Sequence, residues 1–191
     1  MVCGGADMTG SRALALMLAA LLSTAFQAAP ARAADVHWPS DQTPVNADGW
    51  GAIRIGMTVG DFERTTGVQI DLDTGASGSE ACAYAILPKP LGESPQFMFE
   101  SRILTSIRVF QGDVASDRGI RIGDSARQVR AAYPRGLEAG PNAYDSDPPT
   151  QNLTVWNVHT RRGVRYAIDE NGRVSDILVG GKSITYDEGC A

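Results

Sequence analysis

Apolar and polar residues alternate along much of the chain, and a period of two is typical of strands. The clearest example is residues 164–179, where two alternating segments flank Asn171-Gly172. That dipeptide favours a two-residue hairpin turn. With the turn at this place, Tyr166 is expected to pair with Ile177. The pattern therefore predicts an antiparallel hairpin with a defined register.

The predicted hairpin has one apolar face and one mixed face, because successive side chains of a strand point to opposite sides. The apolar face, which is expected to pack on a helix, carries Val164, Tyr166, Ile168, Ile177 and Val179. The mixed face carries Arg165, Ala167, Asp169, Val174, Asp176 and Leu178. In this register Val164 pairs with Val179, and Ile168 pairs with Ser175.

Two pairs of similar segments indicate an internal repeat. Residues 52–56 match residues 119–123 at four of five positions, at an offset of 67. Residues 104–109 resemble residues 174–179, at an offset of 70. Two matches in the same order and at nearly the same offset predict two copies of one unit of about 65–70 residues.

The repeat predicts an α+β fold of two tandem units, each a short helix packed on an antiparallel β-meander. Thr58 and Ser125 each precede an acid or amide by three residues, and this capping-box pattern begins a helix. The expected organisation is a signal peptide (1–33), an extended N-terminal arm (34–50), repeat 1 (51–112) and repeat 2 with a C-terminal tail (113–191).

Transfer of the hairpin register to repeat 1 places Phe97, Phe99 and Phe110 on the side away from the helix. An exposed aromatic patch of this kind indicates a contact surface, so the three residues are candidate binding residues. The preferred alternative is that the chain itself covers them, through the other repeat or through the arm with Trp38 and Trp50. A slip of one residue would instead place Phe97 and Phe99 in the core.

The N-terminal segment has the layout of a cleaved secretory signal. Residues 13–26 carry no charge, Arg12 precedes them, and Ala31-Arg32-Ala33 is a small-x-small cleavage site. The apolar run is too short for a membrane span. Translation is expected to start at Met1 or Met8. The predicted location of the mature chain is the periplasm or the extracellular space.

The mature chain is acidic. Removal of the first 33 of the 191 residues leaves 158, with 15 basic and 21 acidic residues and a net charge of −6. A nucleic-acid partner is disfavoured, since phosphate binding needs clustered Lys and Arg. Cys82 and Cys190 remain, and an even pair in an oxidising compartment predicts a disulfide. The alternatives are two unpaired thiols or an intermolecular bridge.

Catalytic chemistry has little support in the sequence. The two histidines, His37 and His159, lack an evident nucleophile, and no nucleophile-elbow or phosphate-loop motif occurs. Asp71 and Asp73 resemble the start of a calcium loop that lacks its later ligands. We therefore assign no catalytic residue, metal or cofactor. Tyr144 and Trp156 flank an acidic loop and are candidate binding residues, although Trp156 also suits a core position.

Two copies of an Ile-Arg-Ile-Gly strand, a capped helix and a meander resemble the tandem fold of the β-lactamase inhibitor protein. One unit resembles the small outer-membrane assembly lipoproteins. The tail resembles that of uncharacterised secreted bacterial proteins. The residues that carry these resemblances are 53–62, 120–129 and 166–179, with Tyr186, Glu188, Gly189 and Cys190 in the tail.

The resemblance implies a protein that binds other proteins and does not catalyse a reaction. We therefore expect a secreted or periplasmic protein-binding function, inhibitory or scaffolding, with a protein partner, no nucleic acid and no membrane span. The alternative is a carbohydrate-binding module that uses Tyr144 and Trp156. A hydrolase is the third hypothesis, and it ranks last because no set of catalytic residues stands out in the sequence.

Overall fold

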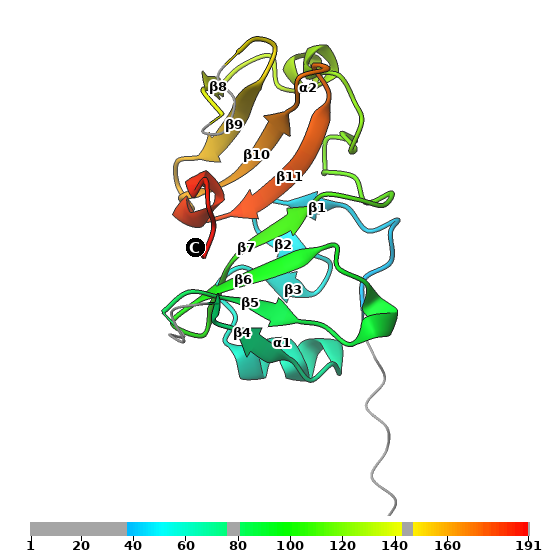
Figure 1. Cartoon of the computed structure of the whole chain (residues 1–191), viewed down its shortest axis with the longest axis vertical. Coiled ribbons are helices and arrows are strands. Elements are labelled where there is room, and N and C mark those ends of the chain that lie inside the picture. The colour runs from blue at the N-terminus through cyan, green and yellow to red at the C-terminus, as the bar shows by residue number, and fades with distance from the viewer. Residues whose placement is uncertain (1–37, 76–80, 143–146, 191) are drawn as a thin grey trace, which may run out of the picture. The chain divides into compact units, whose positions relative to one another are not determined.

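Antiparallel strands make up most of the protein (Figure 1). The computed structural model describes residues 38–75, 81–142 and 147–190. The strands of the larger sheet are β4 (Asp71–Asp73), β5 (Ala83–Ile86), β6 (Gln96–Glu100), β7 (Ile103–Val109), β8 (Leu137–Gly140), β9 (Gln151–Asn157), β10 (Arg162–Ile168) and β11 (Val174–Gly180). Their order in the sheet is β4-β5-β6-β7-β11-β10-β9-β8.

A smaller sheet and short helices complete the described part of the chain. The small sheet contains β1 (Val45–Asn46), β2 (Gly49–Trp50) and β3 (Ile53–Arg54). The helices are α1 (Val59–Thr66), α2 (Ala126–Ala132) and the 3₁₀ turns η2 (Lys89–Leu91) and η3 (Lys182–Thr185). Both α-helices begin with the expected capping box, at Thr58 with Asp61 and at Ser125 with Gln128.

The predicted fold class is wrong. Within the described residues, 38% lie in the strands of two sheets and 15% in helices, so this part of the chain is mostly β rather than two tandem helix-and-meander units. One eight-stranded sheet is continuous through the pairing of β7 with β11. The similar segments also differ locally, since Ile53–Arg54 forms β3 whereas residues 119–123 form no strand. Each of the two segments precedes a helix that begins with a capping box, and β3 pairs with β2 of the N-terminal arm.

The N-terminal arm is part of the folded core. The Val45 amide donates to the carbonyl oxygen of Ala115 (2.9 Å), and the Val45 carbonyl oxygen accepts from the Asp117 amide (2.8 Å). Val45 and Trp50 are fully or almost fully buried. The arm therefore adds backbone pairing to the later connection at residues 115–117, rather than lying as a free extension. The predicted signal peptide, residues 1–33, lies outside the described residues.

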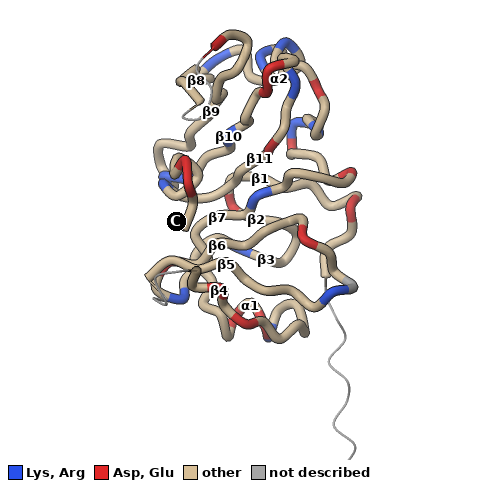
Figure 2. The backbone as a smooth tube through the Cα atoms, in the orientation of Figure 1, with Lys and Arg blue, Asp and Glu red and all other residues tan. Residues whose placement is uncertain are grey.

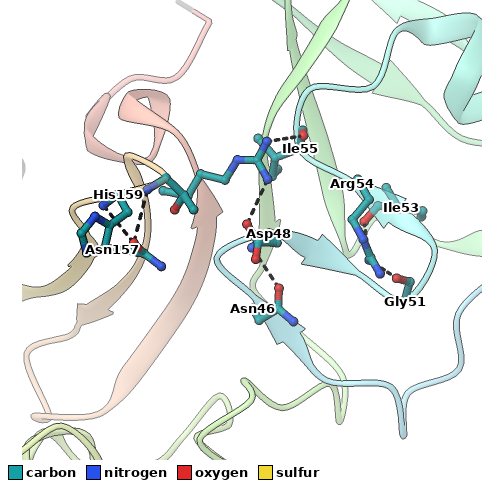
Figure 3. Close-up of polar contacts among 10 residues, drawn as sticks. Asn46, Asp48, Gly51, Ile53, Arg54, Ile55, Asn157 and His159 are labelled. Atoms are coloured by element: carbon teal, nitrogen blue, oxygen red, sulfur yellow. Dashed lines mark hydrogen bonds and ion pairs between the residues drawn. The ribbon is translucent and has the colours of Figure 1, made fainter.

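Arg162 connects the small sheet to β10. Its Nη1 donates to Asp48 Oδ1 and its Nη2 donates to the Ile55 carbonyl oxygen, both at 2.9 Å. Figure 3 shows Asp48 and Ile55 converging at this place. The nearby Arg54 side chain donates to the carbonyl oxygens of Gly51 and Ile53 and fixes the turn of the small sheet. The Arg162 guanidinium therefore joins Asp48 of the arm and the Ile55 backbone to β10.

The hairpin register is confirmed at Tyr166, which pairs with Ile177, and at Val164, which pairs with Val179. A register shift then makes Ile168 pair with Val174 rather than with Ser175. This bulge turns Val174 into the core, where it is 1% exposed, although the sequence pattern placed it on the mixed face. A bulge adds one residue to one strand and reverses the facing of those beyond it.

The register transferred from the hairpin is wrong for Phe97 and Phe99, and the alternative of a one-residue slip that places both in the core is confirmed. Phe97 pairs with Ile107 and Phe99 pairs with Leu104, with a register shift between Met98 and Phe99. Both rings are fully buried against α1, with their centroids 5.0 and 5.9 Å from that of Phe62. The Trp38 ring of the arm covers Phe97 at 5.7 Å. Phe97 and Phe99 are therefore core residues, and only Phe110 remains half-buried.

We expect Phe97→Ala to lower the free energy of unfolding by about 3–5 kcal/mol, because it removes a fully buried ring and leaves a cavity. Phe110→Ala is the matched control and should cost less than about 1 kcal/mol, because that ring is partly in solvent. Urea unfolding followed by circular dichroism measures both values. Equal losses for the two variants would contradict the observed register.

Candidate binding cleft

The face of the large sheet opposite α1 carries charged and polar residues in rows across the strands. Paired residues of neighbouring strands lie side by side on one face. Gln96 pairs with Arg108, Arg108 pairs with Leu178, and Leu178 pairs with Arg165. One row therefore crosses β6, β7, β11 and β10, and it brings two arginines to either side of one leucine.

The next row on the same face has smaller side chains toward the second half of the sheet. Tyr84 pairs with Met98, Met98 with Ser106, and Ser106 with Gly180. The 3₁₀ turn η3 directly follows Gly180 and packs on β7, β10 and β11. Its Ile184 is fully buried but outside the main core cluster. Small residues in this row leave the room that η3 occupies.

A cleft of about 300 Å³ lies on this face, between the sheet and the C-terminal tail. Its lining from the sheet is Tyr84, Gln96, Met98, Ser106, Arg108, Arg165, Ala167, Asp176 and Leu178. Its lining from elsewhere is Asn142, Ser183, Tyr186, Asp187, Glu188 and Gly189. The cleft thus combines residues of both halves of the sheet with a wall that the tail supplies.

Arg165 anchors the tail to the floor of the cleft. The residue is only 9% exposed, so its charge needs partners. Its Nη1 donates to the carbonyl oxygen of Ile184 at 2.9 Å, and its Nη2 donates to Asp187 Oδ1 at 3.0 Å. These two hydrogen bonds offset the cost of burying the guanidinium charge, and they hold η3 and the following residues against β10.

A second arginine–aspartate pair lies across the same row. Arg108 Nε and Nη2 both lie 2.5 Å from Asp176 Oδ1. Asp176 also accepts from the Ser175 hydroxyl at 2.8 Å. The Arg108 guanidinium carbon lies 5.3 Å from the centre of the Phe110 ring, a cation–π distance. Phe110 does not line the cleft itself but contacts Arg108, which does.

The predicted disulfide is confirmed and closes the end of the tail wall. Cys82 and Cys190 are bonded, with their Cα atoms 5.2 Å apart and a sequence separation of 108. A Cβ on Gly189, which has φ +61°, would lie 1.9 Å from the Tyr84 hydroxyl oxygen. The Tyr186 hydroxyl donates to Glu100 at 3.1 Å, and this bond raises the pKa of Tyr186. The tail is thus attached to the sheet by a covalent bond and by polar contacts.

Ser183 has a buried polar group without a partner at the cleft wall. The residue is 3% exposed, and its hydroxyl is the buried side-chain group within the described residues that makes no hydrogen bond. Buried hydroxyls are nearly always bonded, so an unpaired one calls for an explanation. Its position on the lining of the cleft makes a ligand or an ordered water the natural partner.

Trp156 lies apart from this cleft. Its ring lies against Gly163, where a Cβ would come within 2.7 Å of the indole, and the residue is half-buried. Trp156 also borders a second hollow, of about 340 Å³, with Arg118 and Tyr133. Tyr133 and Tyr166 share a hydrogen bond of 2.9 Å, and burial raises the pKa of both hydroxyls. Tyr144 lies outside the described residues.

The histidines form no catalytic arrangement that the structure describes. Asn157 Oδ1 accepts from the backbone amide of His159, which is exposed (Figure 3). His37 lies outside the described residues. Within the described residues no cluster of three or more His, Cys, Asp or Glu side chains has the geometry to hold a metal ion. None of the helices described is long and apolar enough to cross a membrane.

Sequence reasoning placed Arg165, Ala167, Asp176 and Leu178 on one mixed face but did not identify that face as a site. The signal was present, since charged residues alternate with core residues on two neighbouring strands. What it lacked was the pairing of β7 with β11, which brings Arg108 of the first half beside them. Ser183 has no sequence signature. The tail residues carried a resemblance and a predicted disulfide, but the sequence did not place them at a cleft.

Comparison of the chain with known protein families, with curated proteins and with solved structures found no match. The resemblance to the β-lactamase inhibitor protein and to the outer-membrane assembly lipoproteins therefore stays a prediction. The chemistry of the cleft is the basis for a functional proposal.

We expect replacement of both cysteines, Cys82→Ser with Cys190→Ser, to lower the free energy of unfolding by about 2–5 kcal/mol. The bond closes a loop of 108 residues, and its loss frees the end of the tail. Urea unfolding measures the loss. Amide hydrogen exchange should increase most at Tyr186 to Gly189, since Arg165 still holds η3. Unchanged exchange in the tail would contradict a tail wall held by the disulfide.

Proposed function

We propose that the protein is a non-enzymatic binding protein of the periplasm or the extracellular space. It binds a segment of another protein in the cleft between the large sheet and the C-terminal tail. The observation that carries this proposal is the cleft itself, because it is a defined hollow on the sheet face opposite α1, bounded by η3 and the C-terminal tail.

The composition of the cleft supports a protein ligand. Tyrosine, methionine and arginine are enriched in protein interfaces, and the lining contains two of each of tyrosine and arginine together with Met98. Apolar residues such as Leu178 lie among polar groups that are already paired, such as Arg108 with Asp176. A surface with fixed polar groups and apolar area between them suits recognition of a peptide segment.

The compartment is supported by the disulfide, which is consistent with a secreted protein. The net charge of −6 after the predicted cleavage disfavours nucleic acid as the ligand. The tail wall also supports a binding role, since attachment of the tail keeps the cleft in one shape before the ligand arrives. Such preorganisation lowers the entropic cost of binding.

The test is site-specific photo-cross-linking in cells that make the protein from its full-length coding sequence. A benzophenone amino acid at Leu178 lies in the cleft, and the same amino acid at Val158, which is 78% exposed, lies outside it. We expect one discrete cross-linked protein band from position 178 and none from position 158. Position 96 on the same row serves as a second cleft site, should the variant at 178 fold poorly.

Two outcomes would contradict the proposed function. Folded variants that give no adduct at positions 178 and 96 would show that the cleft binds no protein there. Equal adducts at positions 178 and 158 would show contact without use of the cleft. The far-ultraviolet spectrum of each purified variant establishes that it is folded.

A further inference from the structure

We propose that the segment held in the cleft is extended and inserts a lysine or arginine side chain, whose charged end lies beside Glu188. This inference rests on the proposed function and names the kind of residue that the site selects. Three features of the cleft support it: the charge of Glu188, the apolar floor around Leu178, and the unpaired hydroxyl of Ser183.

The charges of the cleft leave one carboxylate uncompensated. Arg108 is neutralised by Asp176, and Arg165 is neutralised by Asp187. Glu188 also lines the cleft, is exposed, and forms no ion pair with another described residue. The five charged groups therefore sum to −1 at neutral pH. An incoming cation is attracted to the tail side of the cleft, and an incoming carboxylate is repelled from it.

The floor of the cleft fits the stem of a basic side chain. Met98, Ala167 and Leu178 supply apolar lining to the cleft, and Leu178 lies between Arg108 and Arg165. Lysine and arginine bury their methylene stems on such surfaces while the charged end stays near water and counter-charge. The cleft volume of about 300 Å³ is at the lower limit for small-molecule sites, which suits one side chain and its adjoining main chain.

The Ser183 hydroxyl indicates independently that a polar atom belongs in the cleft. It lines the cleft, is buried, and has no hydrogen-bond partner. Arg165 donates to the carbonyl oxygen of the next residue, Ile184, so this end of the cleft already has a positive charge. A neutral peptide group of the bound segment suits the Ser183 end, and the cationic group suits the Glu188 end.

In the experiment, the protein is produced from its full-length coding sequence, purified and titrated with four capped peptides. Their sequence is Thr-Val-X-Val-Thr, in which X is lysine, arginine, norleucine or glutamate. Binding is followed by ¹⁵N-resolved amide shifts. We expect the lysine and arginine peptides to bind about two- to fivefold more tightly than norleucine, the range of one partly exposed ion pair. Glutamate should bind more weakly than norleucine. The largest shifts should lie at Met98, Leu178 and Glu188.

Glu188→Gln should remove the advantage of lysine over norleucine and leave the norleucine affinity unchanged. Glu170→Gln is the matched control, because Glu170 is an exposed acid in the β10–β11 turn, away from the cleft lining. Ser183→Ala should weaken all four peptides alike, whereas a purely structural serine would leave their affinities unchanged.

The basic-residue proposal is overturned if lysine and norleucine bind equally, if glutamate is preferred, if no peptide binds, or if Glu170→Gln acts like Glu188→Gln. These results are independent of the cross-linking test. Adducts from position 178 together with no preference for lysine would leave the binding function standing and reject only the basic residue. Absence of both would reject the two proposals together.

Discussion

Four residue pairs between β7 and β11 join the two halves of the large sheet. They place strands about 70 residues apart in sequence side by side. Without this pairing, each half would end in an open strand edge, which proteins rarely leave exposed. The same pairing puts Leu178 between Arg108 and Arg165, so the floor of the cleft exists only because the two halves share one sheet.

The cleft depends on the C-terminal tail as well as on the pairing of β7 with β11. Ile184 fills space above small residues of the sheet, Arg165 binds η3 and Asp187, and the disulfide attaches Cys190 near β5. The Arg165–Asp187 pair alone is modest because it is partly exposed, whereas the disulfide contributes about 2–5 kcal/mol. Together, these contacts of the tail convert a flat sheet face into a walled cleft. Figure 2 shows the acidic and basic residues along the C-terminal part of the chain.

The predicted sites were partly misplaced for a definite reason. Phe97 and Phe99 are the most aromatic part of repeat 1, and a strict period of two placed them on an open face. A single bulge beside Met98 reverses that facing and buries both rings against Phe62. A bulge changes which residues face the core without changing the composition of the strand, so alternation alone could not reveal it.

Local patterns in the sequence were sufficient for the caps at Thr58 and Ser125, for the hairpin around Asn171-Gly172, and for the Cys82–Cys190 bond. Each depends on a few neighbouring residues or on a pair with no other partner. Only the tertiary structure decided the single large sheet, the folding of the arm into the core, and the cleft. These depend on pairings between distant strands, whose energies come from packing and backbone hydrogen bonds that no local pattern contains.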